Sequence, residues 1–179
     1  MMQHNRHGWT DVEHTIDDSR SISLTRTLPI PVEQLWRAWT TNEGARTFFC
    51  QAPDIDLRPG GSYRIIFQPD APEGERGAED CTVLSYIPLR SLTFTWSAPP
   101  AVPEIRALGS VCWVTLEFDS VDDSTSQLTL THHGFGQGPQ WAKVHDYFSE
   151  AWPYVLNMLE RSIFEGPIDW QAHYASSGD

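Results

Sequence analysis

The stretch "FSEAWPYVLNMLERSIFEGP", residues 148–167, decides the fold. Apolar side chains recur in it every three or four residues, which is the spacing of one face of an α-helix. Extended back to Pro139, the pattern predicts a helix over 139–165, about 40 Å long. Pro139 suits its first turn, and Gly166 followed by Pro167 suits its end. A helix with so continuous an apolar stripe needs a large apolar surface to cover.

The predicted helix has two faces when its residues are placed at about 100° intervals. Charged side chains such as Lys143 and Arg161 lie opposite an apolar arc. The arc consists of Trp141, His145, Phe148, Trp152, Val155, Leu156, Leu159 and Ile163. The stripe keeps its phase through Pro153, which lies on the polar side, so the sequence predicts one helix. Because proline has no N–H to donate to the carbonyl of Ser149, we expect a kink between these two residues.

The preceding chain, from about residue 54 to 133, has the alternating pattern of β-strands. Turn signals divide it into three pairs of strands, at Pro59-Gly60-Gly61, Pro88-Leu89-Arg90 and Asp122-Asp123-Ser124. The apolar parity of these strands defines one face of a sheet. Its residues are Tyr63, Ile65, Phe67, Leu92, Phe94, Trp96, Val114, Leu116, Phe118, Leu128, Leu130 and His132. We expect an antiparallel sheet whose apolar face is covered by the C-terminal helix.

The first part of the chain adds one strand and two short helices. Segment 19–28 alternates as a strand does, with Ile22 and Leu24 on one side. Segment 29–41 has apolar residues at helical intervals, namely Val32, Leu35, Trp36 and Trp39. A second short helix is expected over 42–48. The predicted architecture is α+β, with a curved antiparallel sheet wrapped around the long C-terminal helix.

Length and composition bound the class of protein. The 179 residues suit one domain, over 19–168, with a polar extension at 1–18 and a tail at 169–179. The net charge of -12 argues against nucleic acid or an anionic membrane as partner. No apolar run approaches the ~20 residues of a membrane-spanning helix, and the first residues do not resemble a secretory signal. We therefore expect a cytoplasmic protein without membrane insertion.

The three cysteines, Cys50, Cys81 and Cys112, lie far apart and form no CxxC pair. Neither a disulfide framework nor a zinc knuckle is indicated, and we expect small buried residues. His132 and His133 are adjacent on a predicted strand, so they point to opposite faces and at most one joins any site. We expect no metal site and no cofactor, since the sequence also has no phosphate-binding loop and no dinucleotide fingerprint.

Four segments carry a family resemblance: "IPVEQLWRAWTT" (30–41), "LRPGGSYRI" (57–65), "LTFTW" (92–96) and "AWPYVLNMLERSIFEG" (151–166). In this order they resemble the START-like, helix-grip superfamily (SRPBCC), and within it the bacterial homologues of the C-terminal domain of the heat-shock-protein-90 ATPase activator. The resemblance extends over about residues 20 to 166. Ala151, where the family commonly has glycine, and Pro153 depart from the family pattern. The resemblance implies a deep apolar cavity between sheet and helix, which in related members binds lipids, sterols, polyketides or plant hormones.

Aromatic and apolar side chains converge, by parity, on the space between sheet and helix. One interpretation is that they line a partly open pocket, and the other is that they fill this space as a core. The candidate ligand-binding residues are Trp36, Tyr63, Phe67, Phe94, Trp96, Leu116, His132, His145, Trp152 and Leu156. Such pockets are mainly apolar with a few polar anchors. His132, His145 and Tyr86 are candidates for that role, although either histidine also suits an ordinary hydrogen-bonded core position.

The sequence leaves three functions open. No catalytic group is assembled by spacing, so we expect a noncatalytic protein that binds a small hydrophobic molecule under the C-terminal helix. One alternative is an interaction module, such as a chaperone regulator, which an exposed apolar patch on the outer sheet face would support, whereas the predicted outer face is polar. The other is an enzyme of the cyclase or aromatase kind with His132 as base. A homodimer is compatible with each of these functions, and the irregular loop 98–110 forms either a lid or a link between strands.

Overall fold

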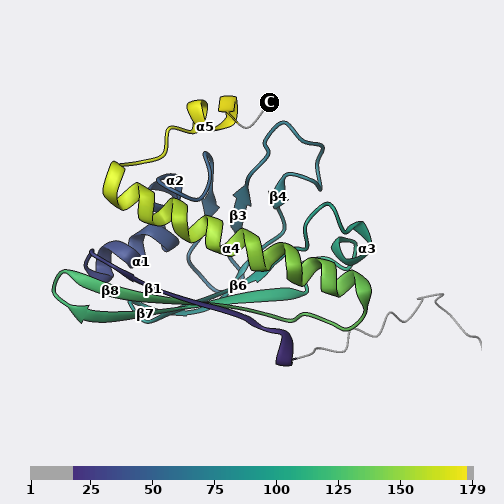
Figure 1. The fold of residues 1–179 in the computed structure, drawn as a ribbon, viewed down its shortest axis with the longest axis horizontal. Coiled ribbons are helices and arrows are strands. Elements are labelled where there is room, and N and C mark those ends of the chain that lie inside the picture. The colour runs from purple at the N-terminus through teal and green to yellow at the C-terminus, as the bar shows by residue number, and fades with distance from the viewer. Residues whose placement is uncertain (1–17, 177–179) are drawn as a thin grey trace, which may run out of the picture.

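The computed structural model describes residues 18–176, and Figure 1 shows their arrangement. Its main layer is a five-stranded antiparallel sheet with the strand order β1-β8-β7-β6-β5. These strands are β1 Ile22–Leu28, β5 Val83–Ile87, β6 Ser91–Trp96, β7 Cys112–Asp122 and β8 Thr125–His133. The long helix α4 (Pro139–Glu165) lies across one face of this sheet. The predicted α+β architecture is confirmed.

Helix α4 has the bounds that the apolar stripe predicts. Gly166 follows it with a φ of 92°, which a residue with a side chain rarely adopts. The helix continues through Pro153, so a single helix forms as expected, and the kink at this residue stays a prediction. Its buried residues are Trp141, Val144, Phe148, Trp152, Leu156, Met158 and Leu159. The predicted apolar arc also contains residues that are only partly buried, namely His145, Val155 and Ile163.

Two short helices connect β1 to the rest of the chain, as the sequence predicts. They are α1 (Val32–Thr40) and α2 (Asn42–Arg46). Thr41 separates them, and its side-chain oxygen accepts a hydrogen bond from the backbone N–H of Gly44 at 3.0 Å. This bond caps the start of α2. The Val32, Leu35, Trp36 and Trp39 side chains of α1 are buried, which confirms the helical spacing read from the sequence.

A second, smaller sheet departs from the single sheet that was expected. Its strands are β2 Asp54–Ile55, β3 Tyr63–Ile66 and β4 Gly77–Ala78, and a bridge between Ser62 and Thr82 connects it to the edge of the main sheet. Prolines at positions 53, 59, 69 and 72 flank these strands. Because proline has no N–H to donate, the hydrogen-bond ladder ends near them and the strands stay short. The sequence did not predict β4, since two residues carry no alternation.

Three further short elements are absent from the sequence-based prediction. They are a 3₁₀ turn at Asp18–Arg20, helix α3 (Pro103–Arg106) within the loop 98–110, and helix α5 (Trp170–Ser176). Helix α5 lies in the segment assigned to a tail, and its first residue is buried. Apart from Asp18, the extension expected at 1–18 lies outside the described residues. None of the helices within 18–176 is long and apolar enough to cross a membrane.

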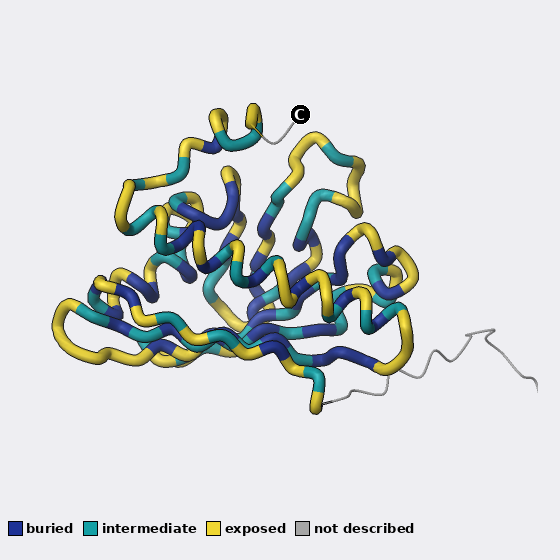
Figure 2. Tube along the Cα trace, in the orientation of Figure 1, coloured by how far each residue is buried: buried dark blue, intermediate teal, exposed yellow. Residues whose placement is uncertain are grey.

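Burial alternates along the strands of the main sheet, as Figure 2 shows. The side chains that face α4 are buried and confirm the predicted parity; they are Leu92, Phe94, Trp96, Val114, Leu116, Phe118, Leu128, Leu130 and His132. The opposite face carries hydroxyl groups that pair across strands. Thr25 contacts Thr129 at 3.1 Å, and Thr93 on β6 contacts Thr115 on β7 at 3.2 Å. The outer face of the sheet is therefore mainly polar, with Trp113 among its few apolar side chains.

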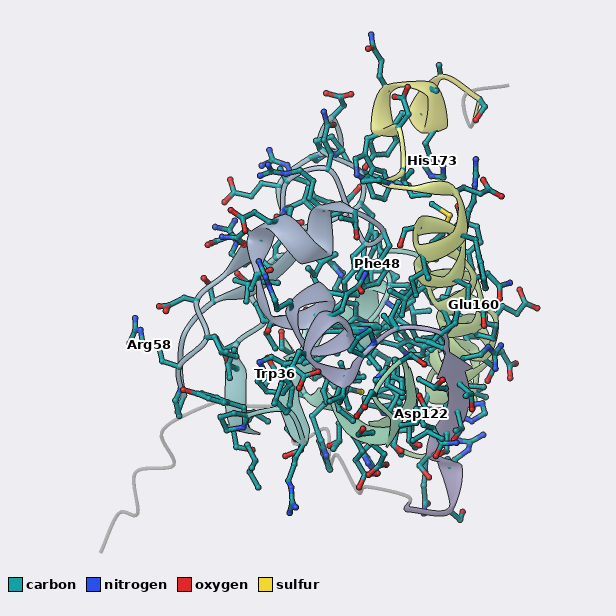
Figure 3. The ribbon with its side chains drawn as sticks, turned by 90° about the vertical axis from the view of Figure 1, so that its left-hand side faces the viewer. Trp36, Phe48, Arg58, Asp122, Glu160 and His173 are labelled. Carbon is teal, nitrogen blue, oxygen red and sulfur yellow. The ribbon has the colours of Figure 1, made fainter. Side chains whose placement is uncertain are left out.

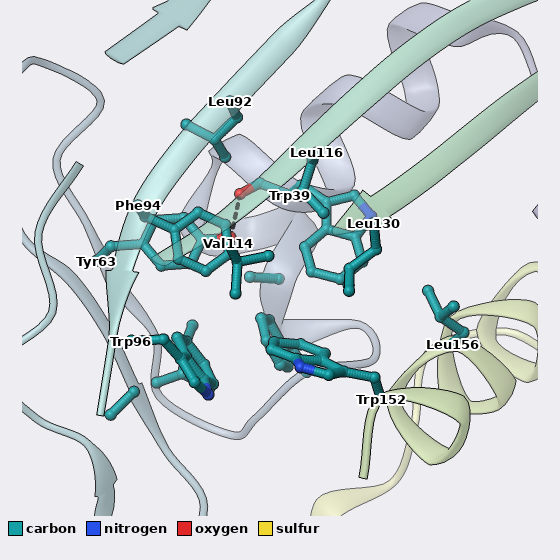
Figure 4. Close-up of a cluster of buried hydrophobic side chains, with 14 of the residues drawn as sticks. Trp39, Tyr63, Leu92, Phe94, Trp96, Val114, Leu116, Leu130, Trp152 and Leu156 are labelled. Carbon is teal, nitrogen blue, oxygen red and sulfur yellow. Dashed lines mark hydrogen bonds between the residues drawn. The ribbon is translucent and has the colours of Figure 1, made fainter. Parts of the chain in front are cut away.

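Tyr63 connects the smaller sheet to helix α1. Its hydroxyl donates a hydrogen bond of 2.9 Å to the backbone carbonyl of Trp39, drawn as a dashed line in Figure 4. The carbonyls in the last turn of a helix have no partner within the helix, so a side-chain donor is needed when they are buried. The Tyr63 ring also stacks on Phe94, with centroids 4.0 Å apart. One side chain thus joins α1, β3 and β6.

We expect Tyr63→Phe to lower the free energy of unfolding by about 1–2 kcal/mol, because it leaves a buried carbonyl without its donor and keeps the ring in place. Chemical denaturation followed by circular dichroism would measure this loss. Tyr86→Phe, at a half-buried position, is the matched control and should change stability by no more than about 0.5 kcal/mol. Equal stability of the wild type and the Tyr63 variant would contradict the assigned role of the hydroxyl.

Candidate functional site

A cleft of about 860 Å³ opens beside the middle of α4. Its floor is formed by the segments that follow α2 and β3 and by the last residue of β6, and its outer walls by α4, the loop after β6 and α5. A second depression, of about 800 Å³, lies between α1, α2 and the end of α4. Its lining includes Glu33, Arg37 and Glu43 and has no aromatic side chain. The first cleft is therefore the candidate site for an apolar ligand.

Aromatic rings form the deep end of the cleft. Trp96 at the end of β6 and Trp152 on α4 both belong to the cluster drawn in Figure 4. Their ring centroids are 5.1 Å apart. Phe49 stacks nearly parallel to Trp96, at 6.0 Å and 11°, and Phe148 stacks on Trp152 at 6.2 Å and 26°. Phe67 meets Trp96 edge-on at 6.4 Å and 73°. These contacts join the sheet to the helix, and because Phe49, Trp96, Phe148 and Trp152 are buried, only their edges reach the cleft.

The outer wall combines residues of α4 and α5. Tyr147 and Tyr154 lie on the exposed side of α4, at 48% and 54% exposure, and both line the cleft. Trp170, His173 and Tyr174 of α5 line it from the other side. Figure 3 shows His173 on α5 at the top of the view and Phe48 in the interior. The Tyr154 hydroxyl and the His173 ring nitrogen Nε2 are 3.5 Å apart, so the two helices meet across the cleft.

Helix α5 is held in place by hydrogen bonds to the end of α2. The indole Nε1 of Trp170 donates to the carbonyl of Arg46 at 2.6 Å, and the backbone N–H of Ile168 donates to the carbonyl of Thr47 at 2.9 Å. These carbonyls lie at the C-terminal end of a helix, where no backbone N–H of the helix is available to donate to them. The segment that looked like a tail thus supplies one wall of the cleft.

Arg106 and Glu79 organise the loops at the mouth of the cleft. The three guanidinium nitrogens of Arg106 donate to the carbonyls of Gly74, Ala98 and Gly77. The Glu79 carboxylate lies 3.6 Å from Arg106 and accepts the backbone N–H groups of Gly74 and Arg76 at 2.9 and 2.6 Å. Burial alone would raise the pKa of Glu79, but these two donors and the Arg106 charge hold that pKa below its usual value. The pair thereby fastens the loop 70–79 to α3.

His132 is fully buried on β8 and holds the ring of Trp152. Its Nδ1 accepts a hydrogen bond of 2.9 Å from the indole Nε1 of Trp152. Burial, with smaller contributions from the charges of His133 and His145, lowers the pKa of His132 to about 3. The ring is therefore neutral, and because Nδ1 accepts, the proton is on Nε2. No hydrogen-bond partner of this Nε2 lies among residues 18–176.

The structure brings together only part of the predicted ligand-binding set. Phe67, Trp96 and Trp152 line the cleft. Five other members are packed in the closed core between sheet and helix, namely Tyr63, Phe94, Leu116, His132 and Leu156. Trp36 packs against Phe118 at 5.1 Å, toward the α1 end of the sheet. The open volume lies beside the helix, because side chains fill the space beneath it.

His145 also lies outside the cleft lining. Its ring is 5.1 Å from Phe135, and its Nδ1 is 3.8 Å from a carboxylate oxygen of the exposed Asp146. The side chain is only partly buried. Tyr86, the third polar candidate, lies 6.4 Å from Trp36 and is likewise not part of the cleft.

Several cleft residues were missed from the sequence, although some left a signal. Tyr147, Ala151, Tyr154 and Met158 recur at helical intervals beside the apolar stripe and form its second edge. Phe48 and Phe49 follow α2 directly and belong to no alternating pattern. Trp170 stands alone in a polar segment, where a large apolar residue indicates a docked element.

Within residues 18–176 the titratable side chains form no metal-binding cluster, and two of the buried thiols are not activated. No group of three or more His, Cys, Asp or Glu side chains within residues 18–176 is arranged to hold a metal ion. The cysteines are free and buried, as expected. Burial raises the pKa of Cys50 to about 11 and that of Cys112 to about 12, so both thiols stay protonated at neutral pH.

Residues 29–163 match the family model described as "Activator of Hsp90 ATPase homolog 1-like protein". The chain belongs to this family. Together with the sheet that grips α4, the match confirms the START-like helix-grip assignment. Membership in this Aha1-like family supports a ligand-binding or regulatory module in general and specifies neither a ligand nor a reaction. No functionally curated protein is similar enough to match.

Solved structures of bacterial proteins share the Aha1-like fold. Protein NE0264 from Nitrosomonas europaea is 25% identical, with a TM-score of 0.61 over 82% of this chain and 95% of that one. Protein MLL2253 from Mesorhizobium loti is 21% identical, with a TM-score of 0.60 over 79% and 94% of the two chains. The Aha1 dimer from Colwellia psychrerythraea is 15% identical, with a TM-score of 0.59 over 82% and 97%. At these identities the last two show the fold alone.

We expect His132 to make the stability of this Aha1-like chain depend on pH. The neutral buried ring resists protonation down to a pKa of about 3, whereas in the unfolded chain the ring takes up the proton below the ordinary histidine pKa of 6.5. As pH falls from 6.5 toward 4, this residue should therefore lower the free energy of unfolding by up to about 1.4 kcal/mol per pH unit. Urea denaturation at several pH values would measure the slope.

His132→Gln should remove that slope, since glutamine still accepts the indole N–H and does not titrate. His133→Gln is the matched control, because His133 is adjacent on the strand and stacks on Trp113, at 5.6 Å, on the outer face. Identical slopes for the wild type and His132→Gln would show that another group causes the acid sensitivity.

Proposed function

We propose that this Aha1-like protein binds a small hydrophobic molecule noncatalytically in the cleft between α4, α5 and the edge of the sheet. The observation that carries the proposal is an aromatic cleft of about 860 Å³ that stays open beside a filled core. This volume falls within the range of about 300–1,000 Å³ typical of small-molecule sites. The predicted site beneath the helix is thus replaced, in this proposal, by a site at its side.

The polar groups of the cleft are few and suited to orienting a ligand. Gln51 and Gln68 lie in its lining, as do His173 and the tyrosine hydroxyls of α4 and α5. A site with a mainly apolar wall and a small number of donors and acceptors is what binding without covalent chemistry requires. The buried, neutral state of His132 supports the same reading, because a base that does not reach the cleft cannot take a proton from a ligand there.

The interaction-module alternative has less support. An apolar patch on the outer face of the sheet would support it. The described part of that face carries paired Ser and Thr hydroxyls over β1, β8, β7 and β6, and its exposed apolar side chain Ile87 lies at the β5 edge. The family name alone connects this chain to chaperone regulation.

We retain the cytoplasm as the proposed location, for the charge and sequence reasons given above.

Filling the cleft should abolish binding. Ala151 lies on α4 and lines the cleft between the two tyrosines, so Ala151→Trp places an indole in the open volume without changing the core. We expect it to weaken the binding of Nile red, a neutral solvatochromic dye, by about tenfold or more, which corresponds to 1.4 kcal/mol. Fluorescence titration would measure the affinity. Asn157→Trp, on the exposed face of the same helix, is the matched control.

Native mass spectrometry of protein purified from its host tests the same proposal without a chosen probe. A bound organic molecule that is lost in the Ala151→Trp variant would support it. An empty wild-type protein that also takes up no Nile red would overturn it.

A homodimer also stays a proposal, and the edge of the main sheet is the surface we propose for it. Strand β5 is the last strand of the main sheet; Val83 at its start pairs with Gly60 and Gly61, and the residues after it include the exposed Leu84 and Ile87, at 47% and 57%. Exposed apolar side chains on an edge strand favour pairing with a second strand. We expect sedimentation equilibrium to show a dimer and Leu84→Lys to shift it to monomer, with Leu108→Lys as a control away from this edge. A monomeric wild type at high micromolar concentration would exclude the proposed pairing.

A further inference from the structure

Helix α5 is a part of the cleft wall that lies outside the residues matched by the Aha1-like family, 29–163. It spans Trp170–Ser176 and places Trp170, His173 and Tyr174 in the cleft lining. We infer that α5 is a releasable lid anchored by Trp170, and that its release sets the rates at which a ligand enters and leaves the cleft. This inference rests on the proposed binding function of the cleft.

The docking of α5 depends on one indole. Trp170 is the one buried residue of this helix, at 9% exposure, and its N–H donates to the carbonyl of Arg46. His173 and Tyr174 are partly buried, with ring centroids 5.4 and 6.0 Å from that of Trp170. The other residues of the helix are exposed, namely Gln171, Ala172, Ala175 and Ser176. Withdrawal of the Trp170 side chain would therefore separate α5 from the body of the protein.

A helix of seven residues does not persist without such docking. Isolated helices shorter than about 12–15 residues are marginal in water. The first turn of α5 is held by Asp169, whose carboxylate accepts the backbone N–H of Ala172 at 3.1 Å and whose carbonyl accepts that of His173 at 2.9 Å. Helical order in α5 and the burial of Trp170 thus support each other. Segments with few buried contacts open locally at low free energy, so we expect α5 to open as one unit.

The docked helix meets α4 across the cleft. The Tyr154 hydroxyl and the His173 Nε2 are 3.5 Å apart, and both side chains line the cleft. In Figure 1 the chain turns back after α4, and α5 lies at the top of the view. The turn begins at Gly166, whose φ of 92° ends α4. A molecule in the cleft is thus held between α4 and α5, and it leaves between them only when this contact is broken.

A lid and a fixed wall predict different kinetics. A change that weakens α5 without touching the ligand raises the open fraction of the free and of the bound protein by the same factor. If passage requires the open state, the association and dissociation rate constants rise together and the Kd stays the same. If α5 is a fixed wall, neither rate constant changes. The loss of a direct ligand contact would instead raise the dissociation rate constant alone.

Asp169→Ala makes such a change, because this side chain caps α5, is exposed and does not line the cleft. Stopped-flow fluorescence of Nile red with the full chain should show both rate constants raised about fivefold and a Kd within about twofold of wild type. Asp123→Ala, in the exposed turn between β7 and β8, is the control and should change neither. Unchanged rate constants in Asp169→Ala, or a rise in the dissociation rate constant alone, would overturn the lid.

Hydrogen exchange of the free protein tests the anchor. Trp170→Phe keeps a ring and removes the N–H that Arg46 accepts, so the amides of 170–176 should exchange about fivefold faster while those of α4 stay unchanged. Trp36→Phe is the matched control, because it is the same substitution at 8% exposure, on α1. Equal exchange of α5 in the wild type and in Trp170→Phe would overturn the role of Trp170. Failure of Nile red to bind the wild type would overturn the proposed function, whereas the exchange measurement tests the release of α5 by itself.

Discussion

The hydrogen bond from the indole of Trp152 to the imidazole of His132 joins the two layers on which the rest of the structure depends. The two side chains come from the middle of α4 and from the end of β8, and both are buried. Apolar packing alone would allow the helix to slide along the sheet, since dispersion contacts have no direction. A buried donor and acceptor permit one register, because any other leaves both groups without a partner. Phe148 and Leu156, one turn to either side, then meet the sheet at set positions.

The position of the cleft follows from this packing. Aromatic and aliphatic side chains fill the space beneath α4, so open volume can remain only where the sheet no longer reaches. That place is the edge formed by the short strands β3 and β4, with Pro69 and Pro72 in the loop between them. The loops there need another support, and Arg106 provides it by donating to three carbonyls. Helix α5 then covers the remaining side.

The sequence predicts this fold well in segments where the apolar residues recur at one regular spacing. The stripe of α4 runs for more than seven turns at 3.6 residues each, and its bounds agree with the structure. The alternation along β6, β7 and β8 likewise identifies the buried face, including His132. The site is less predictable, because parity shows which side chains face inward and not which of them touch each other. Tyr63 and Phe94 point the same way as Trp96, yet they stack on each other and close the space. Trp170 lines the cleft, although its segment has no regular spacing of apolar residues.

The middle of α4 shows how the same helix serves both stability and an open site. Trp152 points to the sheet, while Ala151, the residue before it, points about 100° away along the helix and lines the cleft. Ala151 carries only a methyl group, so the cleft side of α4 has little bulk at this position. Tyr147 and Tyr154 lie one turn before and one turn after Ala151 and line the cleft on either side of it. A helix of uniformly large side chains would bury the sheet equally well and would close the cleft, so the volume beside α4 depends on a small residue at this place.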